Sequence, residues 1–360
     1  MNRLRPLSLC LTTLLVAAPV AFAHPGHDHQ DRFLVTADAP APVSTADAVT
    51  GSGDLQFRYR ADLSELPEEI AKGIKKAHGG FAKTPSGEIY FGLEGTGLIR
   101  LSADLTTKTL VSTNDAMAGG ALHNTTYLDR KGGMLILPDP ARGRVYATRL
   151  DGEVVATLGR PEVNDYYKNL DNAYRPTDAD MASDGVVYVC DGYAGRYVLT
   201  ADLDDEKFFD RNFGGKVQGA GRTEGEFSTN HGVTFDPTDD TLLIADRERQ
   251  WIQRVTLAGE FVEGFDTGGG DVCDVDFVDW KGERLLVAGC LKSGGGAEPG
   301  FVQILRDGKV VSTLKPKIDL GIELFQHIHN AAGVVVDGKL FVLCYGWNPG
   351  CYAVLEHVTE

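Results

Sequence analysis

Three histidines stand at matching points of the sequence, each close to the start of a short apolar run: His123, His231 and His329. Imidazole nitrogen is a common ligand of zinc, and three histidines that leave a fourth position open make a catalytic or ligand-binding site. Residues so far apart meet only if a repeated architecture brings them together. Polar residues also recur at strand starts because that end of a strand is wet, but wetness explains one histidine better than three.

A tyrosine and an arginine follow two of the apolar runs, in Asp191-Gly192-Tyr193 and Asp246-Arg247. A tyrosine beside a metal cation can have its pKa lowered enough to act as a base. The arginine suits a carboxylate-bearing ligand, because its two-pronged donors match a carboxylate. Each residue alone is also common at the end of a strand. Tyr193 and Arg247 are therefore candidate catalytic residues, with Asp191 and Asp246 as candidate supporting groups.

One sequence unit recurs six times: a polar start, a short strand, a turn with Gly or Asp, a strongly apolar strand and a third strand. The anchor points of copies two to six are 43 to 55 residues apart: His123, Asp178, His231, Asp274 and His329. This period and strand content predict an all-β, six-bladed β-propeller over residues 54–360. The alternating segment Leu55–Leu63 is expected to supply the outer strand of the last blade and close the ring.

The ring decides where the candidate residues lie. With six blades the step between neighbours is about 60°, so the histidines of copies two, four and six should stand about 120° apart around the channel. The second strand of each blade returns to the same face, which brings Tyr193 and Arg247 there. His78 starts copy one and is either a fourth neighbour or an outer group. His327, two residues before His329, is expected to line the channel too.

The N-terminal region has a different character. Residues 1–23 have a basic start, an apolar stretch and an Ala-Phe-Ala cleavage pattern, which together predict a signal peptide and a secreted or periplasmic protein. Residues 24–53, rich in Ala, Pro, Thr and Asp, predict a flexible leader. Its three histidines, His24, His27 and His29, either hold a transition metal weakly or belong to an exposed polar terminus.

The charge and hydropathy pattern exclude some partners. The formal net charge is −16, and removal of the two arginines in residues 1–23 gives −16 − 2 = −18. Such an acidic chain is a poor partner for nucleic acid or anionic membranes. No later apolar run reaches the length of about 18 residues that a membrane span needs. We expect a monomer that binds a small-molecule or peptide ligand with a carboxylate.

Several of these stretches resemble one known family. "CDGYAGRYV", "STNHGVTFD" and "IADRERQWIQRV", together with the histidines that open copies two and six, resemble the peptidylamidoglycolate lyase domain. That family has a six-bladed propeller of the NHL-repeat type and splits a peptidyl-α-hydroxyglycine into a peptide amide and glyoxylate. The resemblance covers most of the ring and is sharp in copies three and four.

The resemblance implies zinc ligands at His123, His231 and His329, a catalytic base at Tyr193 and an active-site arginine at Arg247. Calcium is a second candidate cation, although Asn330 stands where the family has the acid associated with structural calcium. The family's first-blade arginine is also replaced, by Leu93 or Glu94, and His327 stands in place of a methionine.

Two functions compete on these residues. The first is a zinc-dependent carbon–nitrogen lyase like that of the family, which Tyr193 beside the histidines favours. The second is a non-catalytic propeller that binds a metal, peptide or glycan through its top face, which the missing first-blade arginine favours. A third hypothesis, a copper-handling protein, is based on the three leader histidines together with the channel histidines. The spacing of the leader argues against it, because no histidine stands third from the new N-terminus.

The cysteines give a separate prediction. A hairpin about Lys281-Gly282 would place Cys273 opposite Cys290, and a turn about Trp347-Asn348 would place Cys344 opposite Cys351. An oxidising compartment favours a disulfide bond in each pair. Buried free cysteines are also common in protein cores.

Overall fold

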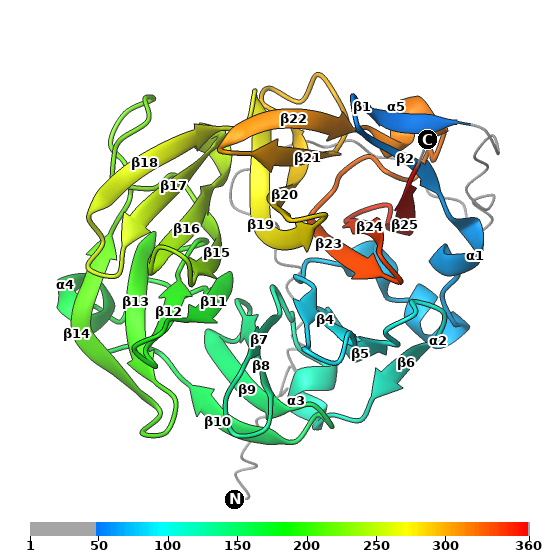
Figure 1. The fold of residues 1–360 in the computed structure, drawn as a ribbon. Coiled ribbons are helices and arrows are strands. Elements are labelled where there is room, and N and C mark those ends of the chain that lie inside the picture. The colour runs from blue at the N-terminus through cyan, green and yellow to red at the C-terminus, as the bar shows by residue number, and fades with distance from the viewer. Residues whose placement is uncertain (1–47, 359–360) are drawn as a thin grey trace, which may run out of the picture. The chain divides into compact units, whose positions relative to one another are not determined.

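The computed structural model describes residues 48–358, so the predicted signal peptide and all but the end of the predicted leader lie outside the described residues. Within this range the chain forms six small antiparallel sheets arranged around a centre, as Figure 1 shows. The predicted six-bladed β-propeller is confirmed. The sheets are called blades 1 to 6 below, in the order of the six sequence copies.

Five blades are built from four consecutive strands each, and their inner strand comes first. Blade 1 comprises β3 (Ala82–Lys83), β4 (Ile89–Leu93), β5 (Gly97–Leu101) and β6 (Lys108–Val111). Blade 2 comprises β7 (Thr126–Leu128), β8 (Met134–Asp139), β9 (Arg144–Arg149) and β10 (Val154–Leu158). Blade 3 comprises β11 (Asp178–Met181), β12 (Val187–Cys190), β13 (Tyr197–Asp202) and β14 (Lys207–Gly214).

The remaining blades follow the same plan with longer strands. Blade 4 comprises β15 (Asn230–Asp236), β16 (Thr241–Asp246), β17 (Trp251–Thr256) and β18 (Phe261–Asp266). Blade 5 comprises β19 (Gly270–Trp280), β20 (Glu283–Ser293), β21 (Phe301–Arg306) and β22 (Lys309–Leu314). Blade 6 takes β23 (Asn330–Val336), β24 (Lys339–Gly346) and β25 (Cys351–His357) from the C-terminal end.

Blade 6 is completed from the N-terminal end, as predicted. Strand β2 (Leu55–Tyr59) pairs antiparallel with β25, with Phe57 opposite His357. A further strand, β1 (Val49–Ser52), pairs with β2 and makes this sheet five-stranded. The propeller therefore begins by Val49, inside the segment predicted as leader. The closure joins the two ends of the ring by backbone hydrogen bonds and covers an otherwise open sheet edge.

The apolar second strands explain the core. Strands β4, β8, β12 and β16 are buried along their whole length, which is why they read as continuous apolar runs rather than alternating ones. Within the described residues there are six apolar clusters, and each one joins two neighbouring blades. Blade-to-blade packing of this kind holds the inner strands, and the residues on them, in fixed positions around the channel.

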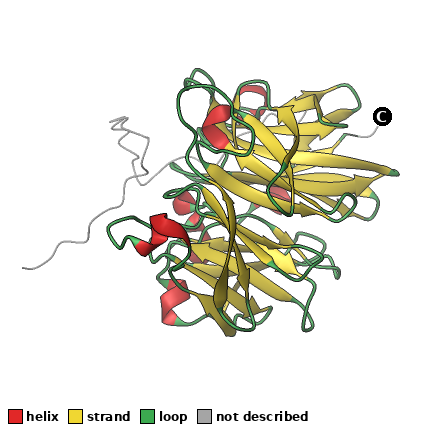
Figure 2. Cartoon of the chain, turned by 90° about the vertical axis from the view of Figure 1, so that its left-hand side faces the viewer, coloured by secondary structure: helices red, strands yellow, loops and turns green. Residues whose placement is uncertain are grey.

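The helices are short and lie in the connections between strands (Figure 2). They are α1 (Ala61–Ser64), α2 (Glu68–Ala71), α3 (Asp115–Ala118), α4 (Asn164–Lys168), α5 (Pro316–Leu320) and the 3-10 turns η1 (Ile74–Lys76) and η2 (Arg247–Arg249). None of these helices within residues 48–358 is long and apolar enough to cross a bilayer.

The two predicted disulfide bonds are absent, and strand register gives the reason. All five cysteines among the described residues are buried free thiols. Strands β19 and β20 do turn at Lys281-Gly282, but the register shifts between Val272 and Asp274, so Cys290 pairs with Val272. Cys273 is the extra residue of this β-bulge.

The second pair fails because its turn is longer than predicted. Gly346 pairs with Cys351, and Cys344 therefore pairs with Ala353. The turn spans four residues, whereas the prediction required a two-residue turn.

Candidate metal centre

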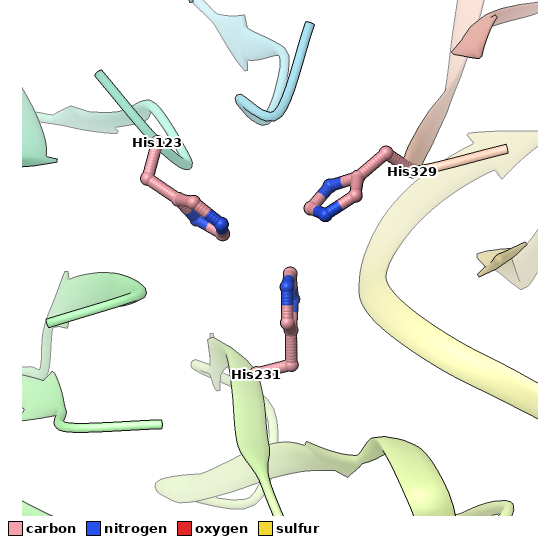
Figure 3. Close-up of side chains that lie close together, drawn as sticks. All are labelled: His123, His231 and His329. Carbon is pink, nitrogen blue, oxygen red and sulfur yellow. The ribbon is translucent and has the colours of Figure 1, made fainter. Parts of the chain in front are cut away.

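The three predicted histidines meet at one point. His123, His231 and His329 each have a ring nitrogen within 4.8 Å of those of the other two, and all three residues are buried. Their ring centroids are 4.7 to 5.3 Å apart. Figure 3 shows the three rings pointing toward one another from separate segments of the chain.

Strand ends place each histidine at the same height on the channel wall. The amide of His123 donates to the Pro138 carbonyl at the end of β8 (2.9 Å), and the amide of His329 donates to the Tyr345 carbonyl near the end of β24 (3.1 Å). His231 is the extra residue of a bulge in β15, where the pairing shifts between Asn230 and Gly232. Each ring therefore leaves its strand where the ladder begins, and points into the channel.

Two of the rings are oriented by main-chain carbonyls of the next blade. The Nδ1 of His123 contacts the Thr177 carbonyl at 2.6 Å, and the Nδ1 of His231 contacts the Cys273 carbonyl at 2.8 Å. A carbonyl only accepts, so Nδ1 carries the hydrogen, and in the neutral ring the lone pair is on Nε2. Metal-binding histidines commonly have this arrangement, because the outer contact fixes both tautomer and ring angle. The donor set therefore fits a divalent transition metal such as zinc.

The bulge that removes the predicted Cys273–Cys290 bond also serves the metal centre. It turns the Cys273 carbonyl toward His231. The fit is close, since a Cβ on Gly232 would lie 2.8 Å from the Cys273 carbonyl oxygen and 2.5 Å from an Asp274 carboxylate oxygen. Only glycine allows the two inner strands to approach this closely after His231.

Tyr193 lies against the histidines. Its hydroxyl is 3.1 Å from Nε2 of His123 and 2.8 Å from Nε2 of His231. Burial raises the pKa of Tyr193 above its usual value, although the positive charge of Arg247 opposes the shift. The hydroxyl is placed to donate a hydrogen bond to these ring nitrogens, and the role of Tyr193 as a base stays a prediction.

Arg247 is buried and also reaches Tyr193. Its Nη1 donates to the tyrosine hydroxyl at 3.4 Å, and its guanidinium carbon is 5.5 Å from the tyrosine ring centroid. Its Nε and Nη2 both donate to one carboxylate oxygen of Glu248, at 2.8 and 2.7 Å. Burial alone would raise the pKa of Glu248, but Arg247 lowers it to about 2. Since Glu248 occupies this pair of donors, Arg247 offers the site Nη1 instead of the expected two-pronged contact.

Asp191 and Asp246 act on the chain segments that carry the site. Asp191 accepts from the Gly195 and Arg175 amides, both at 2.6 Å, and so fixes the loop that holds Tyr193. Asp246 accepts from the Ser228 and Thr229 amides, at 2.8 and 3.2 Å, just ahead of His231. Burial raises the pKa of Asp191 to about 6 and raises that of Asp246 above its usual range. Both residues position their neighbours.

The two further predicted histidines, His78 and His327, lie in different surroundings. The His78 ring is 4.9 Å from the His329 ring and 5.6 Å from the His123 ring, but His78 is outside the cluster of three mutually close ligand atoms. It is therefore a neighbour behind the ligands. His327 is half-buried and its Nδ1 donates to the Asn348 carbonyl at 3.1 Å. It packs on Trp347, with ring centroids 5.8 Å apart.

Sequence reasoning missed a group of channel carboxylates. Asp178, Asp180, Asp274 and Asp276 line a cavity of about 290 Å³ along the inner strands, which run away from the histidines. Burial and the charge of Asp274 raise the pKa of Asp178, and burial raises that of Asp274 to about 7. Their signal was present in the alternating pattern of β11 and β19, where Asp178 and Asp274 had been used only as repeat anchors.

These carboxylates have partners in neighbouring blades. Asp178 accepts from the Val233 amide and Asp180 from the Phe235 amide, both at 2.7 Å. Asp274 accepts from the Asn330 amide group at 2.8 Å. They connect blade 3 to blade 4 and blade 5 to blade 6. The suggestion of calcium near Asn330 stays a prediction.

No protein-family model matches the sequence, and a search of curated proteins found no matching relative. Among solved structures, a gluconolactonase from Xanthomonas campestris aligns with a TM-score of 0.57 and 13% identity, over 88% of this chain and 97% of that one. A structural-genomics target described as a "putative gluconolactonase" aligns with a TM-score of 0.56 and 16% identity, over 86% of this chain and 97% of that one. At these identities the likeness establishes the fold.

The comparisons correct the family expectation. The propeller fold that the resemblance implied is present, but none of these comparisons shows membership of the peptidylamidoglycolate lyase family. The better-aligned structures are gluconolactonases, which are hydrolases, so the predicted zinc-dependent carbon–nitrogen lyase is wrong. What remains from the sequence is a six-bladed propeller with a buried cluster of three histidines that could hold a metal.

Proposed function

We propose that the protein is a metal-dependent hydrolase that opens a lactone or cleaves an ester of a small acid. The observation that carries this proposal is the contact of the Tyr193 hydroxyl with Nε2 of both His123 and His231, with Arg247 behind it. The three-histidine cluster is the donor set for the metal. The likeness of the fold to gluconolactonases supports a lactone as the substrate class.

A divalent metal bound by the three histidines would supply Lewis-acid activation of a carbonyl oxygen or of water. The chain's own residues have the remaining tasks. The Thr177 and Cys273 carbonyls hold two of the ligands in the neutral form that binds metal. Blade packing buries the cluster and limits its contact with bulk water.

Tyr193 and Arg247 act on the oxygen of the reacting carbonyl. In the structure the Tyr193 O–H contacts Nε2 of His123 and of His231, and a metal bound to those nitrogens would release it. When water adds to the carbonyl carbon, that oxygen gains negative charge, and the released O–H would donate a hydrogen bond to it. Arg247 Nη1 contacts the same hydroxyl and adds positive charge nearby. Preorganised donors of this kind typically stabilise an oxyanion by about 2.7–4 kcal/mol each. The carbon–oxygen bond to the leaving alcohol then breaks, and the alcohol oxygen takes the proton that the attacking water has given up.

The test uses purified protein stripped of metal with a chelator and reloaded with zinc. Hydrolysis of δ-valerolactone and glucono-δ-lactone is followed by acid release at constant pH, against the spontaneous rate. We expect zinc-dependent turnover that is lost in His231→Ala. A zinc-loaded protein that leaves both lactones, and the aromatic lactone dihydrocoumarin, at their spontaneous rates would overturn the proposal.

The non-catalytic alternative makes a different prediction. Glu248 already occupies two Arg247 donors, which leaves a weaker anion contact than a free arginine would give. This observation favours a binding propeller over an enzyme that depends on a strong carboxylate clamp. Metal-dependent binding of a carboxylate without turnover of either lactone would support the alternative.

A further inference from the structure

A tryptophan lies beside the metal cluster on the side of blades 6 and 1. Trp347 is half-buried in the turn between β24 and β25. Its ring is 5.5 Å from the His78 ring and 5.8 Å from the His327 ring. His78 in turn contacts the His329 ring at 4.9 Å. Aromatic rings interact at separations of 4.5–7 Å, so an unbroken row of ring contacts leads from Trp347 to the metal centre.

Main-chain contacts hold this row in place. The Asn348 amide donates to the Lys75 carbonyl at 3.0 Å, which ties the Trp347 turn to the segment before blade 1. The Nδ1 of His327 donates to the Asn348 carbonyl at 3.1 Å. The Nδ1 of His78 donates to the Lys76 carbonyl at 3.0 Å. The Nδ1 of His78 also lies 3.4 Å from a Glu94 carboxylate oxygen. Both Nδ1 atoms are thus engaged, and the row presents ring faces and edges together with the Nε2 atoms and the indole N–H. We call Trp347, His78 and His327 the aromatic wall.

The aromatic wall stands across the site from the polar pair. Tyr193 follows the second strand of blade 3, and Arg247 follows that of blade 4. Trp347 follows the second strand of blade 6, and His78 precedes the inner strand of blade 1. In a six-bladed ring, blade 3 is opposite blade 6 and blade 4 is opposite blade 1. A ligand at the histidines would therefore have hydrogen-bond donors on one side and ring surfaces on the other.

We propose that the aromatic wall selects an aryl group on the ligand, so that the natural substrate is an aryl-bearing acyl compound. This inference rests on the proposed function, because it assumes that the reacting carbonyl lies at the histidines. A polyhydroxylated ring would need several hydrogen-bond partners, and the wall's Nδ1 atoms are engaged by the main chain. A flat aryl ring needs only ring surfaces, which stack favourably and exclude water.

The test measures binding of two carboxylates to zinc-loaded protein by calorimetry: 3-phenylpropionate and propionate. They share the carboxylate and differ in the aryl group. We expect 3-phenylpropionate to bind at least about tenfold more tightly. Trp347→Leu should remove most of this preference, and Trp347→Phe should keep it. Zinc stoichiometry in each variant reports whether the site has folded.

The outcomes separate this inference from the proposed function. Equal binding of the two carboxylates, or a preference that persists in Trp347→Leu, would overturn the aromatic wall. If both lactones hydrolyse and Trp347→Leu leaves the preference intact, the hydrolase stands and the wall does not. If neither lactone hydrolyses, and the aryl-bearing lactone dihydrocoumarin does not hydrolyse either, but the binding preference depends on Trp347, the wall stands and the hydrolase does not.

Discussion

The even-numbered and odd-numbered blades share one strand plan but have different tasks. Blades 2, 4 and 6 supply His123, His231 and His329. Blades 3 and 5 supply the carbonyls of Thr177 and Cys273 that orient two of those rings. Alternate blades thus provide ligands and the supports for those ligands. A repeated fold can thus build a site from neighbouring copies, of which one carries the histidine and the next carries the carbonyl that orients it.

The odd blades also carry the buried carboxylates, and here blade 1 departs from blades 3 and 5. Lys83 pairs with the first residue of the second strand in blade 1, as Met181 does in blade 3, so these two residues are equivalent. Three residues earlier, Gly80 of blade 1 is therefore the counterpart of Asp178. A Cβ on Gly80 would lie 3.3 Å from an Asp274 carboxylate oxygen. Blade 1 instead supplies Lys83, which donates to Asp276 at 2.6 Å. Blade 1 thus lacks the acid and pairs instead with an acid of blade 5, the odd-numbered blade beyond blade 6.

The largest expected effect comes from removing a candidate metal ligand of an even-numbered blade. His231→Ala should lower zinc affinity by more than about a hundredfold, because two imidazoles remain and even outer contacts are worth tenfold to a hundredfold. Metal analysis after dialysis, with the thermal unfolding midpoint with and without zinc, measures this. His327→Ala is the matched control and should still bind one zinc. A His231→Ala protein with full zinc content would remove this residue from the centre.

Removal of the Tyr193 hydroxyl in blade 3 should leave zinc binding unchanged and slow turnover. Tyr193→Phe should bind zinc normally and hydrolyse the responsive lactone about a hundredfold more slowly, because one oxyanion donor is missing. Initial rates at saturating substrate, with zinc content measured on the same sample, check this. Tyr188→Phe in the same blade, away from the histidines, is the control. Unchanged turnover in Tyr193→Phe would show that its hydroxyl takes no part.

The odd-blade carboxylates should make stability depend on pH. Burial raises the pKa of Asp274 to about 7, so the folded protein keeps it protonated while the unfolded chain ionises it near pH 4. Keeping Asp274 protonated lowers the free energy of unfolding. This loss of stability is absent below about pH 4 and grows as the pH rises toward about 7. Asp274→Asn should therefore stabilise the metal-free protein at pH 7, by up to about 4 kcal/mol, and flatten this dependence.

Urea unfolding of the metal-free protein between about pH 4 and pH 8 measures this dependence. The exposed Asp205→Asn is the matched control and should leave the curve unchanged. An Asp274→Asn protein whose stability falls with pH as steeply as the parent's would show that Asp274 is ionised in the fold.

The smallest effect should come from the cysteine at the odd-blade bulge. Cys273 orients His231 through its carbonyl, so Cys273→Ala should keep zinc affinity within about threefold while it loses only side-chain packing. A reducing agent should leave the unfolding midpoint of the parent unchanged, because the five described cysteines are free thiols. A midpoint that drops on reduction would reveal a disulfide bond, which typically contributes about 2–4 kcal/mol.

The sequence alone was sufficient for the repeat and for the meeting of the three candidate ligands. The apolar second strands are buried along all or most of their length and recur at a regular period, so the ring could be predicted from the pattern. Because equivalent positions lie at equivalent angles, the meeting of His123, His231 and His329 followed from the ring. The strand Leu55–Tyr59 was also predictable, since the last copy lacked an outer strand.

Tertiary structure alone decided the details between blades. A bulge inserts one residue without leaving a mark in the apolar pattern, so the shift at Cys273 and its contact with His231 could not be read from sequence. The pairing of Arg247 with Glu248 depends on how the turn η2 packs. The period of a repeat determines which blade a residue belongs to, whereas the contacts between blades depend on register shifts of a single residue.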